Sequence, residues 1–271
     1  MPRILPTVLT KTDIRKICLS PSTTAGVLSE MRPRHTELLN RKSFCFEFSN
    51  GINLWYRFGK ECLEWSQDGR TFYEEYAECL ESTRQNVFLV HHLRTHENPY
   101  SAVTLVIDTA ESLITLVDDR LGTIHSNRDV CRKVEFGCFD GAVPGHVLTK
   151  ELTGVVIDWK IADSVIIHQM YENESCCAFV SPPPPTAPEW KEFFITFNPT
   201  KYVKLRDKLY LISFTAPGSS GIEANMLMDL DSMTQVGSLF GIDLADTLRS
   251  YTFGGYGSYA EVAFVGRYTV E

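Results

Sequence analysis

The segment RQNVFLVHHLRT, residues 84–95, places two adjacent histidines and an arginine within an apolar strand pattern. Successive side chains of a strand point to opposite faces, so His91 and His92 are expected to enter different environments, only one of them a lumen. Histidine titrates near neutral pH, which makes the lumen-facing ring a candidate general acid or base. The sequence does not show which of the two it is, and a hydrogen-bonded core or interface histidine is the competing interpretation. Arg94, a third catalytic candidate, can hold a carboxylate or an enolate.

The segment RTFYEEYAE, residues 70–78, offers a second set of groups that exchange protons. Tyr73 and Glu75 share one face of the expected strand, and Glu74 and Tyr76 share the other. A tyrosine beside a glutamate in an apolar pocket can hold a phenol or an enol and move its proton. We therefore favour Tyr73 and Glu75 as catalytic residues, although glutamate usually belongs to the solvent face.

Large aromatic side chains and one further histidine are candidates for the wall of a ligand site. Tryptophan supplies a broad apolar surface, although it lies more often in a filled core. His168 is included because it aligns with Trp55 when the two halves of the chain are compared. The ligand-binding candidates are Trp55, Trp65, Tyr76, Trp159 and His168.

The sequence predicts neither a metal site nor a cofactor. His91, His92, His96 and Glu97 lie close together, but adjacent strand residues direct their rings to opposite faces, which does not suit a shared metal ion. The eight cysteines form no C-x-x-C motif and no zinc spacing, so they are expected to be reduced thiols. No nucleotide- or pterin-binding fingerprint is present.

Strands must position these residues, and strand patterns fill the chain. Short alternating segments are separated by turn residues, and Asn50-Gly51 and Asp68-Gly69 are strong hairpin signals. Helical periodicity is confined to residues 10–19 and 243–250. The sequence therefore predicts an all-β protein with few short helices.

The same order of strand patterns returns in the second half of the chain. Phe46 aligns with Trp159, and further along Val87 aligns with Leu209. Antiparallel strands without covering helices must close on themselves or stack as two sheets, because open edges invite aggregation. One small closed barrel per repeat is the first choice and a sandwich is the second.

Several segments of both halves resemble a known family. GINLWYRFG, YAECLESTRQNVFLVHH and VIDTAESLITLV resemble the N-terminal half of the MoaF-like family, named for molybdenum cofactor biosynthesis protein F. ELTGVVIDWKIADSVIIHQMYENE, KYVKLRDKLYLISFTAPGS and LMDLDSMTQVGSLFG resemble its C-terminal half. The resemblance spans residues 38–271 and implies two lipocalin-like antiparallel β-barrels in tandem. It brings no catalytic residue set with it.

The ligand or active site is expected in the first half of the chain. His91 and His92 are replaced by Ser213 and Phe214 in the second half, which is rich in plain aliphatic residues and is expected to serve as scaffold. The expected domains are an N-terminal extension over residues 1–37, a first lipocalin-like barrel over 38–145 and a second over 146–271.

Composition excludes several classes of partner. The net charge of −8 and the pI near 5.4 come without a basic patch, so nucleic acid is not an expected partner. No apolar run approaches the roughly 20 residues that cross a bilayer, and the first residues lack the apolar core of a secretory signal. A cytoplasmic protein without membrane contact is expected.

The sequence predicts a barrel enzyme that handles a small hydrophobic organic molecule. The favoured reaction class is a cofactor-independent isomerisation, cyclisation or lyase reaction by general acid–base catalysis on a substrate like a secondary metabolite. The alternative is a carrier that binds such a ligand without changing it. Proton-transfer pairs in the lumen favour the enzyme, and a purely aliphatic and aromatic lining favours the carrier. A third interpretation is structural, with filled lumens and a surface for a homodimer.

Overall fold

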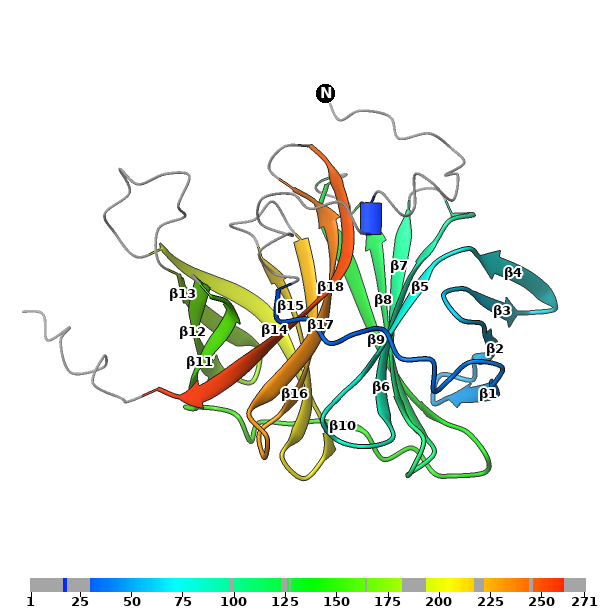
Figure 1. Cartoon of the computed structure of the whole chain (residues 1–271), viewed down its shortest axis with the longest axis horizontal. Helices are drawn as coiled ribbons and strands as arrows, with labels where there is room; N and C mark the ends of the chain where they lie inside the picture. Colours follow the sequence, from blue (N-terminus) through cyan, green and yellow to red (C-terminus); the bar gives the residue numbers. More distant parts are fainter. Residues whose placement is uncertain are drawn as a thin grey trace, which may run out of the picture.

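The computed structural model describes residues 17–18, 30–97, 100–122, 126, 128–163, 165–181, 194–216, 222–243 and 246–260. Within these residues the chain forms two antiparallel sheets of nine strands each (Figure 1). The all-β prediction is confirmed. Among the described residues, no helix has the length and the apolar character needed to cross a bilayer.

The first sheet has the spatial order β4-β3-β2-β1-β9-β8-β7-β6-β5. Its strands are β1 (Ser43–Phe48), β2 (Asn53–Phe58), β3 (Leu63–Gln67), β4 (Arg70–Glu74), β5 (Ala77–Glu81), β6 (Val87–Arg94), β7 (Ser101–Asp108), β8 (Leu113–Leu121) and β9 (Val130–Cys138).

The first sheet curls around its core but keeps a seam between its edge strands β4 and β5. The segment before β1 supplies backbone hydrogen bonds to the edge strand β5 and to β2, which lies two strands from the edge strand β4. The amide of Thr36 donates to the carbonyl of Cys79 in β5 at 2.8 Å, and the amide of Arg41 donates to the carbonyl of Phe58 in β2 at 2.8 Å. The segment thus covers the β5 side of the seam, which protects this edge strand from pairing with other molecules.

The second sheet has the order β10-β14-β13-β12-β11-β18-β17-β16-β15, and β14 also pairs with β15. This additional pairing closes the second barrel. Its strands are β10 (Val147–Leu148), β11 (Val156–Ala162), β12 (Val165–Asn173), β13 (Cys176–Ser181), β14 (Phe194–Arg206), β15 (Leu209–Ala216), β16 (Ile222–Asp229), β17 (Thr234–Ile242) and β18 (Leu248–Tyr259).

Turn chemistry sets the strand boundaries as the sequence predicts. Between β3 and β4, Asp68 and Gly69 have φ angles of 52° and 76°, the pair of positive values that a tight hairpin turn requires. The short helix expected over residues 243–250 is wrong, because β18 begins at Leu248. Of the helix expected over residues 10–19, only the helical Ile17 and Cys18 lie within the described residues.

Strand registers confirm the internal repeat. Phe46 in β1 faces Leu54 in β2, and Trp159 in β11 faces Ile167 in β12. The aligned residues of the two halves therefore occupy the same places in equivalent hairpins. The result is two barrels in tandem, as the sequence predicts, one closed and one with a covered seam.

Each barrel has its own apolar lumen. The first is filled from strands around the whole sheet, including Phe46, Leu54, Phe88, Val103, Leu105 and Phe139. The second is filled by residues that include Trp159, Tyr171, Tyr202, Ile212, Phe214 and Met226.

The two barrels pack against each other through their most apolar strands. Figure 1 shows β6, β7 and β8 of the first sheet beside β15, β16 and β17 of the second. Equivalent residues of the repeats meet in one cluster at this interface, among them Val87 with Leu209, Leu89 with Leu211 and Val106 with Leu227. A contact in which equivalent surfaces face each other is the pattern of a two-fold dimer, here built within one chain.

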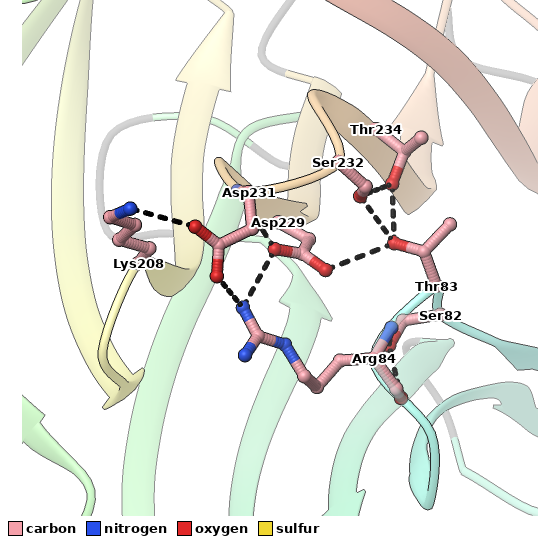
Figure 2. A network of polar contacts seen from close by, with 8 residues as sticks. All are labelled: Ser82, Thr83, Arg84, Lys208, Asp229, Asp231, Ser232 and Thr234. Carbon is pink, nitrogen blue, oxygen red and sulfur yellow. Dashed lines mark hydrogen bonds and ion pairs between the residues drawn. The ribbon is translucent and has the colours of Figure 1, made fainter.

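Two reciprocal ion pairs show the same approximate two-fold relation. Arg84, just before β6, donates from Nη2 to Oδ1 of Asp229 at the end of β16, at 2.9 Å (Figure 2). Arg206, at the end of β14 just before β15, donates from Nε to Oδ2 of Asp108 at the end of β7, at 2.5 Å. Each barrel therefore presents an arginine to an aspartate of the other barrel at equivalent places.

The Arg84 pair lies within a larger polar network at the interface (Figure 2). Arg84 also donates to Asp231 at 2.9 Å, and Thr83 donates to Oδ2 of Asp229 at 3.1 Å. The hydroxyl of Thr83 lies 2.6 Å from those of Ser232 and Thr234. The network fixes the turn before β6 against the β16–β17 hairpin.

Candidate functional site

Strand β6 runs between the first lumen and the interface, so its two faces meet different surroundings. All eight of its residues are buried. Phe88 and Val90 belong to the first lumen, whereas Leu89 and Leu93 belong to interface clusters. His92 therefore points into the lumen and His91 points into the interface.

His91 is a hydrogen-bonded interface histidine. Its Nδ1 lies 3.1 Å from Oγ1 of Thr104, and its Nε2 lies 2.8 Å from Oγ of Ser250 in the second barrel. Burial lowers the pKa of His91 to about 4, so the ring is neutral near pH 7. Its partners explain its conformation fully, and the lumen role expected for one of the two histidines falls to His92.

His92 is held in one tautomer inside the first lumen. Its Nδ1 lies 3.2 Å from the carbonyl oxygen of Leu93. Because a carbonyl oxygen can only accept a hydrogen bond, Nδ1 carries the proton. Nε2 is then the acceptor, and the hydroxyl of Tyr56 lies 3.3 Å from it. Burial, with the nearby charge of Arg94, lowers the pKa of His92 to about 3.

The Tyr56–His92 contact is a hydrogen bond between two neutral groups. Burial raises the pKa of Tyr56, because the phenolate loses its solvation inside the lumen. The phenol is therefore a weaker acid than in water and the imidazole a weaker base. The resting pair can orient a polar group of a bound molecule, and proton transfer between its members is strongly uphill.

Arg94 lies at the end of β6, on the lumen side. Its guanidinium lies over the ring of Trp65, 5.0 Å from the centroid, a favourable position for a cation. Its Nη1 donates to Asp118 at 3.0 Å and to Glu97 at 3.5 Å. Burial lowers the pKa of Arg94, but the negative charges around it, that of Asp118 first, outweigh burial and raise the pKa overall. Arg94 is thus a fixed cation, and its Nε has no hydrogen-bond partner among the described residues.

Glu74 completes this group of side chains. It is fully buried, and it accepts hydrogen bonds from Nε1 of Trp65 at 3.1 Å and from Oγ1 of Thr95 at 2.7 Å. Burial raises its pKa, although these hydrogen bonds act in the opposite direction. We call the set formed by Tyr56, Trp65, Glu74, His92 and Arg94 the lumen polar cluster.

Tyr73 and Glu75, expected in the pocket, lie on the other face of β4. Tyr73 is 49% exposed, and Glu75 is half-buried. In the β3–β4 ladder Glu74 faces Leu63, a lumen residue, so the register places Glu74 inside and Tyr73 outside. The alternation was therefore correct, but the choice of inner face was wrong.

The remaining candidates are scattered over the molecule. Trp55 is half-buried on the outer face of β2. Tyr76 lies in an interface cluster and donates to Glu78. Trp159 lies in the second lumen, and His168 lies on the outer face of the second barrel with Nδ1 beside the carboxylate of Asp158. Of the proposed ligand-binding residues, only Trp65 joins the lumen polar cluster.

Sequence reasoning missed Tyr56 and placed Glu74 on the wrong side. Tyr56 shares a strand face with Leu54 and Phe58, so period-two alternation was a usable signal for a lumen position. The contribution of Asp118 had no local signal, because it reaches Arg94 from β8.

Metal-ligand chemistry has no visible basis in the part of the chain that the structure describes. There, no group of three or more His, Cys, Asp or Glu side chains could hold a metal ion. All eight cysteines are free thiols, as expected from their spacing. The neighbouring thiols Cys176 and Cys177 are not joined.

The fold and the lumen define a tandem antiparallel β-barrel protein. Residues 23–123 match the family model of the MoaF N-terminal domain, a range that contains β1 to β8 and the whole lumen polar cluster. This part of the chain is thus similar to the MoaF N-terminal domain, as its motifs predict. A search of curated proteins gave no match to it.

Proposed function

We propose that the first barrel binds a small, largely apolar organic molecule whose polar group meets the lumen polar cluster. The observation that supports this function is the uneven lining of the first lumen. Aromatic and aliphatic side chains line most of it, while Tyr56, His92 and Arg94 meet toward the end of β6. Ligand sites of small barrels combine an apolar wall with a few convergent polar groups in this way.

The charges around Arg94 favour a neutral polar group on the ligand. Asp118 and Glu97 already balance the guanidinium, so a ligand carboxylate would add an uncompensated negative charge to a buried site. A hydroxyl or carbonyl group avoids this cost. The hydroxyl of Tyr56 and Nε2 of His92 can each exchange their mutual hydrogen bond for one to such a group.

The binding proposal is tested with a neutral fluorescent probe, N-phenyl-1-naphthylamine. Val103 lies in the first lumen opposite His92, and Ala224 is its equivalent in the second lumen, opposite Phe214. Val103→Phe should place a bulky ring beside His92 and weaken probe binding at least ten-fold, whereas Ala224→Phe should leave it unchanged. Equal affinities in the two variants would contradict a site in the first lumen.

A second test avoids overpacking the lumen. Tyr56→Phe removes a single hydroxyl group from the lumen polar cluster. It should weaken binding of 1-naphthol several-fold and leave binding of naphthalene unchanged, since only the former can hydrogen-bond at this place. An identical effect on both compounds would mean that Tyr56 acts through packing alone.

A second candidate function is cofactor-independent isomerisation, cyclisation or lyase chemistry on a hydrophobic, secondary-metabolite-like substrate in the same lumen. The hydrogen bond of Tyr56 to His92, beside the cation of Arg94, favours it. A neutral imidazole can remove a proton next to a carbonyl while the phenol and the guanidinium stabilise the enolate oxygen. The same imidazolium can return the proton at another carbon, so that atoms and charge balance.

This catalytic candidate is tested with 3-cyclohexen-1-one, whose conversion to the conjugated ketone is followed by ultraviolet absorbance. The wild-type protein should accelerate the conversion, and His92→Gln should abolish the acceleration while it retains binding of N-phenyl-1-naphthylamine. Equal rates for wild type and His92→Gln would leave binding as the function of the lumen.

A further inference from the structure

The second lumen contains three buried amide side chains with unused hydrogen-bonding atoms. Gln169 and Asn198 are 0% exposed and Gln235 is 3% exposed. Nε2 of Gln169, Oδ1 of Asn198 and Oε1 of Gln235 have no hydrogen-bond partner among the described residues. A buried polar atom without a partner is destabilising, so three of them in one barrel require a physical explanation.

All three side chains point into the same space. Gln169 lies on the face of β12 that carries Tyr171, a residue of the second core. Asn198 in β14 faces Cys177, another residue of that core, across the β13–β14 ladder. Gln235 in β17 faces Met228 across the β16–β17 ladder, and Met228 also belongs to the core.

The orientation of the Asn198 amide is determined by its other hydrogen bonds. Its Nδ2 donates to the carbonyl oxygens of Cys177 and Thr196, both at 3.2 Å. If the amide were turned over, Oδ1 of Asn198 would face these two carbonyl oxygens, and neither of them can donate a hydrogen bond. Oδ1 of Asn198 is therefore a free acceptor.

The Gln169 amide lies beside the hydroxyl of Tyr171, which has acceptors in Oε1 of Gln169 and, at 2.9 Å, in Sδ of Met228. Oε1 of Gln169 accepts from the hydroxyl of Tyr171 at 3.2 Å, and this hydroxyl in turn accepts from Nε1 of Trp159 at 3.3 Å. Nε2 of Gln169 has no hydrogen-bond partner among the described residues. With Gln235, the lumen presents one donor and two acceptors without a hydrogen-bond partner among the described residues, and the thiol of Cys177 lies beside Gln169 and Asn198.

The surroundings of these amides are aromatic and uncharged. Phe179 and Phe214 meet edge to face, with ring centroids 4.7 Å apart. Burial raises the pKa of the Cys177 thiol to about 11, so it is neutral near pH 7. A charged ligand would find no counter-ion among these side chains.

From this arrangement we propose that the second barrel holds a separate binding site for a small aromatic molecule that bears a primary carboxamide. Such a group has one carbonyl acceptor and two N–H donors, which match the free Nε2 of Gln169 and the free oxygens of Asn198 and Gln235. Its aromatic body would lie against Phe179 and Phe214. Satisfying buried polar atoms gives strong discrimination against molecules that lack the matching groups.

The probe for this site is benzamide, titrated into the full-length protein by isothermal titration calorimetry. Benzamide should bind at least ten-fold more tightly than acetophenone, which lacks the N–H donors, and than benzoate, which carries a charge. Gln169→Met keeps the side-chain length but removes the free donor, and it should weaken benzamide binding at least ten-fold. Lys150→Met, at an exposed ion pair outside both lumens, is the control and should leave benzamide binding unchanged.

Two outcomes would overturn the proposal. One is failure of the wild-type protein to bind benzamide at millimolar concentration. The other is unchanged affinity in a folded Gln169→Met protein, with folding judged by near-ultraviolet circular dichroism. If Gln169→Met does not fold, Gln235→Met replaces it with the same expected loss and the same contradicting result. Gln169 and Gln235 lie in the second lumen, so a loss of benzamide binding in either variant does not depend on the proposed function of the first lumen.

Discussion

The reciprocal ion pairs at the interface give a prediction that can be worked out from the contacts. Arg206→Met removes the guanidinium that donates to both carboxylate oxygens of Asp108 while it keeps much of the apolar stem. The side chain of Asp108 is only 1% exposed, and that of Arg206 is 22% exposed. The variant therefore leaves a buried carboxylate without its cation.

The size of the effect follows from what remains around Asp108. Breaking a fully buried pair costs about 3–5 kcal/mol. Asp108 keeps hydrogen bonds from the backbone amides of Ala110 and Glu111, at 3.1 and 3.0 Å, and Arg206 is partly in water. We therefore expect Arg206→Met to lower the free energy of unfolding by about 2–4 kcal/mol. The equivalent Arg84→Met should cost less, because Arg84 is more exposed.

The assay is urea unfolding followed by circular dichroism, with Lys150→Met as the control. The Lys150–Glu174 ion pair is largely exposed, and its loss should leave stability unchanged. Adding Asp108→Asn to Arg206→Met should recover at least half of the loss, because it removes the unpaired charge and keeps an acceptor for the backbone amides. If Arg206→Met were as stable as Lys150→Met, the buried ion pair would not hold the barrels together as described.

Three further predictions concern single residues. Burial, with the nearby charge of Glu223, raises the pKa of Asp119, so the folded state keeps a proton that the unfolded state loses. The free energy of unfolding should therefore fall as pH rises above the ordinary aspartate pKa, by up to about 1.4 kcal/mol per pH unit. Asp119→Asn should flatten this slope when it is measured by urea unfolding at several pH values. A slope equal to that of the wild type would contradict this. His92 should show a protonated Nδ1 and a bare Nε2 in ¹⁵N NMR spectra from pH 5 to pH 8, since its pKa is about 3; a titration near pH 6.5 would show that the ring is hydrated. Gly257→Ala would place a Cβ 2.6 Å from Cζ3 of Trp159. This clash should lower the free energy of unfolding by about 1–3 kcal/mol. An unchanged thermal midpoint would mean that the ring can move aside.

Local sequence signals were sufficient for most of the fold. Period-two alternation and positive-φ turns such as Asp68-Gly69 predict the strands, and the alignment of Phe46 with Trp159 predicts the repeat. The seam between β4 and β5 had no local signal, because it depends on where the segment around Thr36 lies. Closure of a barrel is a property of strand pairing between distant residues, which alternation does not encode.

The inner face of a strand was harder to identify than the strand itself. β6 is buried on both faces, because the second barrel covers the face that would otherwise meet water, so polarity could not separate His91 from His92. On β4 the rule that glutamate faces solvent failed for Glu74. Its carboxylate is buried because Trp65 and Thr95 donate to it from other parts of the chain.

The expectation that the second half is only scaffold came from its aliphatic residues. The polar lining of the second lumen comes from single residues on β12, β14 and β17, each of which is unremarkable in its own segment. Only the closed barrel brings Gln169, Asn198 and Gln235 to one space, and only their hydrogen bonds show which of their atoms are unused.

The position of a bound molecule tests the central proposal most directly. Strand β7 is suited to this test, because its alternate residues face the first lumen and the interface. Val103 and Leu105 point into the first lumen, while Ala102 and Val106, next to them in the strand, belong to the interface clusters. Intermolecular NOEs from N-phenyl-1-naphthylamine to methyl-labelled protein should reach Val103 and Leu105 but not Ala102 or Val106. NOEs confined to interface or outer-surface methyl groups would contradict a ligand site inside the first barrel.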